Sequence, residues 1–82
     1  MARIAFHPSF QKIFSKIKDK YLKEKILKQI SKIRINPEVG KPMRNVRKNT
    51  RELYIKPFRL SYSYIKNEDK VIILDLYHKD EQ

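Results

Sequence analysis

Residues that can handle a phosphate ester gather in the stretch RELYIKPFRLSYSYIK. Arg59, Ser61 and Ser63 occupy alternate positions in its second half, opposite a face of large apolar residues. Since serines leave room above a strand, this face is expected to be wet or used for binding. Tyr54 and Lys56 occupy alternate positions in the first half. Because cations neutralise phosphate and aromatic rings stack on bases, the pattern predicts a site for a phosphodiester.

The last apolar stretch of the chain ends in Tyr77, His78 and Lys79. A histidine there could move a proton near neutral pH. Strict alternation puts His78 on the face opposite Tyr77, which leaves two interpretations open. Either the strand ends or bulges near Leu76 and His78 joins the face of Arg59, or His78 is a buried structural histidine and Tyr77 is the functional neighbour.

A second basic segment precedes these strands and is expected to attract phosphate without sequence specificity or to bind an acidic partner. Its candidate residues are Lys41, Arg44, Arg47, Lys48 and Arg51. Glu52 is the acidic residue among these cations. It could act as a general base, although a surface ion pair is the more common role.

The elements that must position these residues follow from hydrophobic spacing. Apolar residues at intervals of three and four predict helices over 10–17, with Ser9 as N-cap, and over 22–33, ending before Asn36. Alternation predicts strands over 3–7, 51–56, 58–65 and 71–78. This order indicates an α+β domain, with a helical hairpin packed on a mostly antiparallel, four-stranded twisted sheet.

The bulk properties restrict the possible partners and chemistry. A chain of 82 residues suits a single domain, 1–82, and lacks both a long apolar span and a signal-peptide pattern, so we expect a soluble, intracellular protein. The absence of cysteine and the two separated histidines argue against a metal site. The net charge of +11 favours nucleic acid, an acidic protein or an anionic membrane surface as partner, although a lysine-rich helix face is more often simply solvated.

The run INPEVGKPM, followed by RELYIKPFRLSYSYIKNEDKVIILDLYHKD, resembles the RelE/ParE superfamily of toxins from toxin-antitoxin systems. The resemblance implies a RelE-like fold and a cytoplasmic toxin that enters the ribosomal A site and cuts messenger RNA. In that reaction the ribose 2′-hydroxyl attacks the neighbouring phosphate, and no metal or other cofactor takes part. It also implies a cognate antitoxin, an acidic and partly disordered chain, which suits the positive charge.

Residue by residue, the resemblance assigns site roles. Arg59 in FRLSY matches the arginine of the family's YRLVY, which holds the scissile phosphate. Tyr54 stands where RelE proteins have a lysine or arginine, which implies stacking or proton transfer. Lys79 matches a C-terminal arginine that supplies charge to the transition state. His78 matches the histidine of GHR and resembles the Tyr-His of YoeB-type toxins, and Tyr77 replaces the usual glycine.

The resemblance also leaves alternatives open. Many RelE toxins carry a tyrosine several residues after GHR, and residues 80–82 contain none, so His78 substitutes for it or the protein is a weak or inactive relative. A ParE-like toxin that poisons DNA gyrase, without a nuclease site, shares the same fold. A basic module that binds RNA without cutting it is the remaining alternative.

Overall fold

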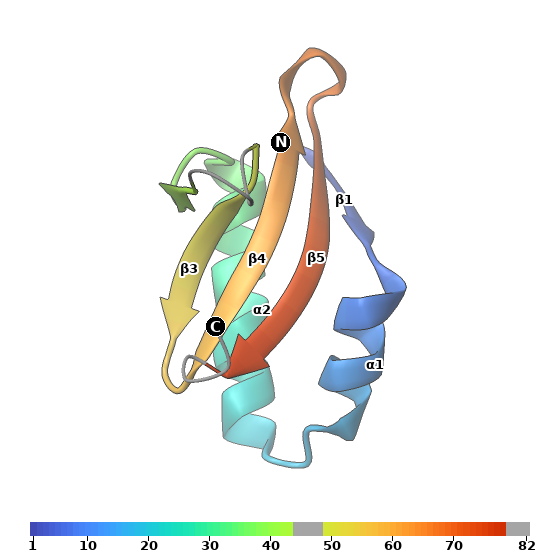
Figure 1. Ribbon diagram of the computed structural model, residues 1–82, viewed down its shortest axis with the longest axis vertical. Helices are drawn as coiled ribbons and strands as arrows, with labels where there is room; N and C mark the ends of the chain where they lie inside the picture. The colour runs from blue at the N-terminus through green and yellow to red at the C-terminus, as the bar shows by residue number, and fades with distance from the viewer. Residues whose placement is uncertain (44–48, 79–82) are drawn as a thin grey trace.

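The computed structural model describes residues 1–43 and 49–78, which form helices and a five-stranded sheet (Figure 1). The helices are α1, Pro8–Lys16, and α2, Lys20–Ile35, with a short 3-10 helix η2, Lys66–Glu68. The strands are β1, Arg3–Phe6, β2, Lys41–Pro42, β3, Arg51–Ile55, β4, Phe58–Ile65, and β5, Lys70–His78. Within the described part of the chain, no helix has the length and apolar character to cross a membrane.

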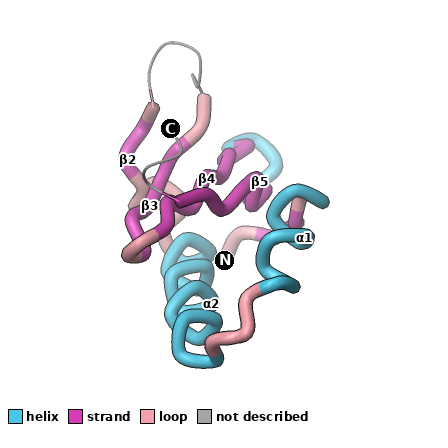
Figure 2. Tube along the Cα trace, turned by 60° about the horizontal axis from the view of Figure 1, so that its bottom comes forward, coloured by secondary structure: helices cyan, strands magenta, loops and turns pink. Residues whose placement is uncertain are grey.

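The sheet has the strand order β1-β5-β4-β3-β2. Strands β2 to β5 pair in antiparallel fashion, and β1 runs parallel to β5. Both helices lie on one side of it (Figure 2). The expected α+β arrangement is therefore confirmed, but the expected count of four strands was wrong. The fifth strand is β2, whose two residues pair with β3 and are too few to show any alternation.

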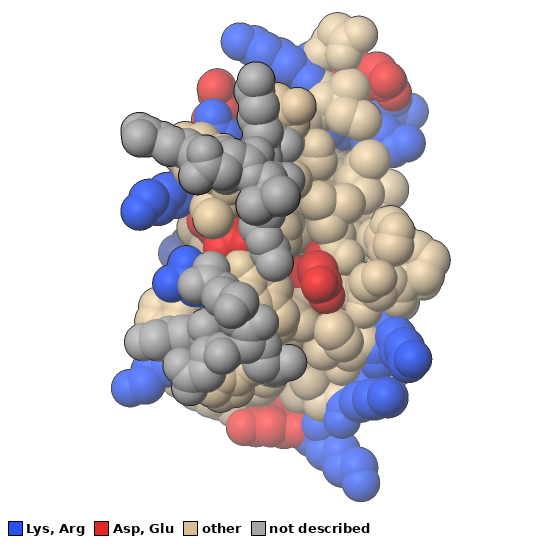
Figure 3. Space-filling model, in the orientation of Figure 1, with Lys and Arg blue, Asp and Glu red and all other residues tan. Residues whose placement is uncertain are grey.

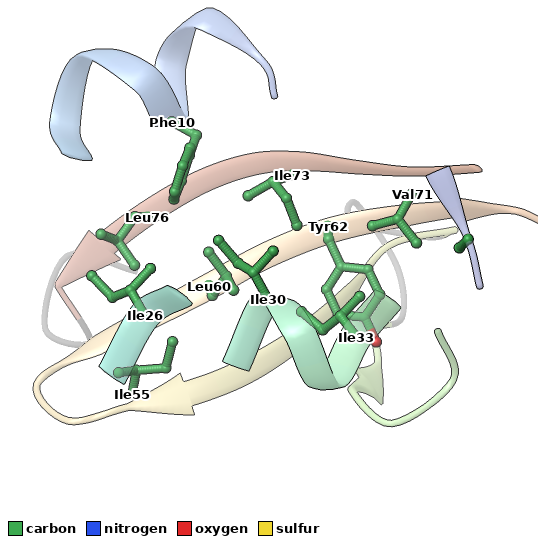
Figure 4. Close-up of a cluster of buried hydrophobic side chains, with 11 residues drawn as sticks. Phe10, Ile26, Ile30, Ile33, Ile55, Leu60, Tyr62, Val71, Ile73 and Leu76 are labelled. Carbon is green, nitrogen blue, oxygen red and sulfur yellow. The ribbon is translucent and has the colours of Figure 1, made fainter. Parts of the chain in front are cut away.

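The core lies between α2 and the sheet (Figure 4). Ile26, Ile30 and Ile33 project from α2 at the spacing of one helical face and are almost fully buried. They meet Leu60 and Ile73 of the sheet, which are completely buried. Because burying one such side chain contributes roughly 1.5–3 kcal/mol, this layer holds β4 and β5 firmly against the helices.

Each of the two α-helices begins at a capping side chain. The Nδ1 atom of His7 accepts the backbone N–H of Ser9 at 3.1 Å, and Pro8 occupies the first position of α1. The expected N-cap at Ser9 was therefore two residues late, since proline at a first helical position loses no hydrogen bond. The Oδ1 atom of Asp19 accepts the N–H groups of Tyr21 and Leu22 and so starts α2.

The loop after α2 is tied to the sheet by Tyr62. The Tyr62 hydroxyl accepts the N–H of Gly40 at 2.8 Å and donates to the carbonyl of Pro37 at 2.7 Å. A Cβ atom on Gly40 would lie 2.6 Å from that hydroxyl oxygen, so the close approach requires glycine. The guanidinium of Arg51 donates to the carbonyls of Gly40 and Glu38 and holds the loop from the other side.

A bulge in β5 changes which residues face the helices. Ser61 and Tyr62 of β4 pair with Asp75 and Ile73 of β5, which leaves Leu74 as an extra residue. Each residue of β5 after Leu74 therefore faces the side of the sheet opposite to the one that strict alternation from the start of the strand would give. This shift decides the orientation of the C-terminal candidates.

Candidate functional site

Three paired residues cross the sheet face that lies away from the helices. Tyr54 of β3 is paired with Arg59 of β4, and Arg59 is paired with Tyr77 of β5. The Cβ atoms of such directly opposite residues lie about 4.5–5.5 Å apart, so the three side chains are neighbours. Tyr54 is 53% exposed. Figure 3 looks onto this face and shows acidic side chains near its middle, with Lys and Arg side chains around the rim.

Beside this row lies the buried carboxylate of Glu52. Its side chain is only 3% exposed. The Tyr77 hydroxyl donates a hydrogen bond to Glu52 Oε2, although the two residues belong to strands separated by β4. Ser61 pairs with Glu52 on the intervening strand. Because the serine side chain is small, the longer glutamate can reach across β4 to the tyrosine.

Arg59 completes the cluster as its cation. Its Nη1 atom lies 3.6 Å from Glu52 Oε1, which is within ion-pair range but too long for a good hydrogen bond. Its side chain is partly exposed, and its Nε atom is buried without a hydrogen-bond partner among the described residues. A guanidinium carries five N–H donors in a planar fork, so Arg59 retains donors that suit an oxyanion.

Two of the predicted RNA-binding cations lie in different settings. Lys56 is exposed in the turn that joins β3 to β4, just before the strand that carries Arg59. Arg51 lies at the opposite end of β3, where its guanidinium binds the carbonyls of the loop after α2 and lies 3.6 Å from the Glu38 carboxylate. These contacts give Arg51 a structural role in holding that loop.

His78 lies on the helix side of the sheet, opposite Arg59 and Tyr77. It is paired with Phe58 and meets that ring edge-on, with ring centroids 5.9 Å apart. The bulge at Leu74 produces this orientation, and no further bulge near Leu76 reverses it in β5. Of the two interpretations of the sequence, the geometry agrees with the one in which Tyr77 is the neighbour of Arg59. A catalytic role for His78 stays a prediction.

The remaining candidates, Lys79, Arg44, Arg47 and Lys48, lie outside the described residues. The sequence predicts a general base or a surface ion pair for Glu52, and it does not predict the burial of this side chain. The alternation of serines on β4 was the available signal, because small residues on one strand make room for a long neighbour. Among the described residues, 1–43 and 49–78, no cluster of three or more His, Asp or Glu side chains could hold a metal ion.

Comparison with known protein families matches residues 4–82 to the family described as the ParE toxin of the type II toxin-antitoxin system parDE. The chain belongs to this family. It is thus a toxin of the RelE/ParE superfamily, as the sequence motifs indicated. Comparison with curated protein sequences finds no match.

Solved structures of RelE and YoeB/ParE toxins share the fold of this ParE-family chain. The intact E. coli RelBE complex matches with a TM-score of 0.81 and 14% identity, over 95% of this chain and 96% of that chain. A YoeB/ParE toxin from Agrobacterium tumefaciens gives 0.83 and 14%, over 93% and 96%. The archaeal RelE-RelB complex from Pyrococcus horikoshii gives 0.79 and 15%, over 99% and 98%. At these identities the likeness establishes the fold.

Proposed function

We propose that this ParE-family toxin is a ribosome-dependent endoribonuclease that cuts messenger RNA. The observation that carries the proposal is the row of Tyr54, Arg59 and Tyr77 on the open sheet face, with the buried carboxylate of Glu52 beside it. This combination supplies a cation for the phosphate, a ring for a base and groups that exchange protons. The contact of a buried carboxylate with a tyrosine hydroxyl, next to a cation, supports an enzyme over a toxin that acts only by binding.

The proposed reaction divides the site among these residues. The guanidinium of Arg59 holds the non-bridging oxygens of the scissile phosphate and stabilises the charge that develops there. The exposed ring of Tyr54 stacks on a neighbouring base, and Lys56 attracts the phosphate next along the strand. Lys79 supplies further positive charge, as the resemblance implies. The 2′-oxygen bonds to phosphorus and the bond to the 5′-oxygen breaks, which leaves a cyclic phosphate and a 5′-hydroxyl.

The proposed partners are a cognate antitoxin and the ribosome with its messenger RNA. The similar structures from E. coli and Pyrococcus horikoshii are complexes of RelE with RelB, and another similar structure is a YoeB-YefM complex from Staphylococcus aureus. The net charge of +11 supports an acidic, partly disordered antitoxin chain and a polyanionic target alike. We place the activity in the cytoplasm, where ribosomes are.

The test is cleavage of messenger RNA on programmed ribosomes by the purified protein, freed of any antitoxin. Arg59→Ala is expected to lower the cleavage rate by at least about tenfold, or 1.4 kcal/mol of barrier. Arg3→Ala is the matched control, because it removes an exposed arginine from β1, two strands away from β4. An Arg59→Ala rate equal to that of Arg3→Ala would reject the site. Ribosome binding without cleavage by the wild type would favour the non-catalytic RNA-binding module.

Gyrase inhibition is the second candidate, and the matching family model favours it because that model describes the ParE toxin of parDE. The same preparation should therefore be assayed for inhibition of DNA supercoiling by gyrase. Inhibition that survives Arg59→Ala, together with no cleavage on ribosomes, would replace the nuclease by the gyrase toxin.

A further inference from the structure

The Glu52 carboxylate is too deeply buried to contact a substrate itself. Its side chain is 3% exposed, although it belongs to the same sheet face as Arg59 and Tyr77 and lies beside them. A carboxylate in this position can still exchange a proton if another group connects it to the surface. The Tyr77 hydroxyl makes that connection, because it donates its hydrogen bond to Glu52 Oε2.

Tyr77 is well placed to reach the reacting atoms. It is directly paired with Arg59, so their side chains leave neighbouring strands at the same level of the sheet. A phosphate held by the guanidinium would therefore bring its adjacent ribose next to the tyrosine ring. Ser61, only 4% exposed, keeps the space between the strands open for the glutamate.

We propose that Tyr77 is the catalytic residue that accepts the proton of the attacking 2′-hydroxyl, with Glu52 as the positioning residue that receives the tyrosine's own proton. This inference rests on the proposed nuclease function. In the step, the 2′-oxygen forms its bond to phosphorus while its proton passes to Tyr77 Oη, and the phenolic proton passes to Glu52 Oε2. The bond between phosphorus and the 5′-oxygen breaks, and the 5′-oxygen takes a proton from water. Tyr77 ends neutral and Glu52 ends protonated.

Arg59 couples phosphate binding to this relay. Its Nη1 atom lies 3.6 Å from Glu52 Oε1, so the cation that holds the phosphate also faces the final proton acceptor. One oxygen of the Glu52 carboxylate therefore faces Arg59, and the other accepts the hydrogen bond of Tyr77. The carboxylate thus positions the two groups relative to each other. This gives a buried acid a function beside a group that binds an anion.

The test is a double-mutant cycle in single-turnover cleavage on programmed ribosomes. Tyr77→Phe and Glu52→Gln are each expected to lower the rate on the order of 10²-fold, the usual range for loss of proton transfer, while ribosome affinity is retained. Because both groups serve one relay, the double variant should be about as slow as Tyr77→Phe alone. Tyr64→Phe, which removes a tyrosine hydroxyl from the helix side of β4, is the matched control and should retain the wild-type rate.

A messenger with sulfur in place of the scissile 5′-oxygen tests whether Tyr77 acts as a general base or as a general acid. The sulfur leaving group departs without a proton, so the reaction of this substrate needs no general acid. The Tyr77→Phe defect should persist on this substrate; a defect that vanishes there would make Tyr77 an acid and overturn the assignment. A Tyr77→Phe rate equal to wild type would also overturn the assignment, and so would losses from Tyr77→Phe and Glu52→Gln that multiply in the double variant. In either case a slow Arg59→Ala variant would still support the nuclease function. If the wild type does not cleave, the proposed function itself fails. Should Glu52→Gln not fold, as judged by thermal melting, the Tyr77→Phe results decide alone.

Discussion

Tyr62 shows how much of this fold depends on one hydroxyl group. It is completely buried, and its oxygen joins β4 to the loop after α2 through Gly40 and Pro37. Tyr62→Phe keeps the ring but leaves the buried N–H of Gly40 and the partly buried carbonyl of Pro37 without their partner. We expect it to lower the free energy of unfolding by about 1–3 kcal/mol, measured by urea denaturation at neutral pH. An unchanged unfolding midpoint would mean that water replaces the hydroxyl.

The same residue predicts a loss of stability in alkali. Burial raises the pKa of the Tyr62 hydroxyl above 10.0, against opposing effects of the Gly40 hydrogen bond and the Arg51 charge, and the nearby Glu38 carboxylate raises it further. The folded state therefore prefers the neutral form, and this contribution to stability is complete below pH 10.0 and is lost as pH rises through the folded pKa. Urea denaturation at increasing alkaline pH should show the loss, and Tyr62→Phe should show less of it than wild type.

Gly40 is predicted to be intolerant of any side chain. A Cβ atom would meet the Tyr62 ring and hydroxyl at 2.6–3.0 Å, so Gly40→Ala should destabilise the protein by roughly 1–3 kcal/mol in thermal or urea unfolding. Part of the clash involves the hydroxyl oxygen, so the loss should be smaller when the alanine is introduced into Tyr62→Phe. If Gly40→Ala destabilises the wild type and Tyr62→Phe by the same amount, the clash does not involve the Tyr62 hydroxyl oxygen.

Single residues of the site were predictable where they obey simple alternation. Tyr54 and Arg59 lie on the face that the pattern of β3 and β4 assigned to them. The face on which His78 lies was not predictable, because the extra residue Leu74 reverses the alternation in the rest of β5. The residues on either side of Leu74 are ordinary strand residues, so the sequence does not mark the bulge. The burial of Glu52 was missed for a related reason: its partner Tyr77 is brought close only by the register of three strands.

At the scale of the elements, α2 depends on its first turn. Asp19 accepts two backbone N–H groups there, and the helix has no acidic residue in its first turn to compensate. Asp19→Ala is expected to lower the free energy of unfolding by about 1 kcal/mol. Asp19→Asn is the matched control, since asparagine caps about as well as aspartate. A loss of equal size in both would point to the charge rather than the cap, and circular dichroism during thermal unfolding measures both.

The helices and the three long strands were predictable because each is long enough to display a period. Ile26, Ile30 and Ile33 mark one face of α2, and Leu60 and Tyr62 mark one face of β4. The pairing of β1 parallel to β5 and the two residues of β2 have no such signal. Both are fixed by tertiary contacts: β1 by its place beside β5, and β2 by the loop that Tyr62 and Arg51 hold.

At the scale of the whole molecule, the charge of +11 is spread over both sides of the sheet, but the two sides should contribute differently to binding. Exposed lysines of α2, such as Lys28 and Lys32, lie on the helix layer, away from the face that carries Arg59. Lys56 lies in the turn just before β4, the strand that carries Arg59. Screening reduces interactions beyond about 8 Å at physiological salt, so only cations close to the target contribute strongly there.

This difference gives a matched pair of variants, Lys56→Gln and Lys28→Gln, each of which lowers the net charge from +11 to +10. If Lys56 contacts a phosphate of the bound messenger, one fewer counterion is released when Lys56→Gln binds the ribosome. The slope of log affinity against log salt, measured between about 50 and 200 mM salt, should then become shallower by about 1. Lys28→Gln should leave that slope unchanged, because a solvated lysine on the helix layer releases no counterion on binding. Equal effects of the two variants would mean that the protein is attracted by its total charge, without the oriented sheet face that the proposed cleavage requires.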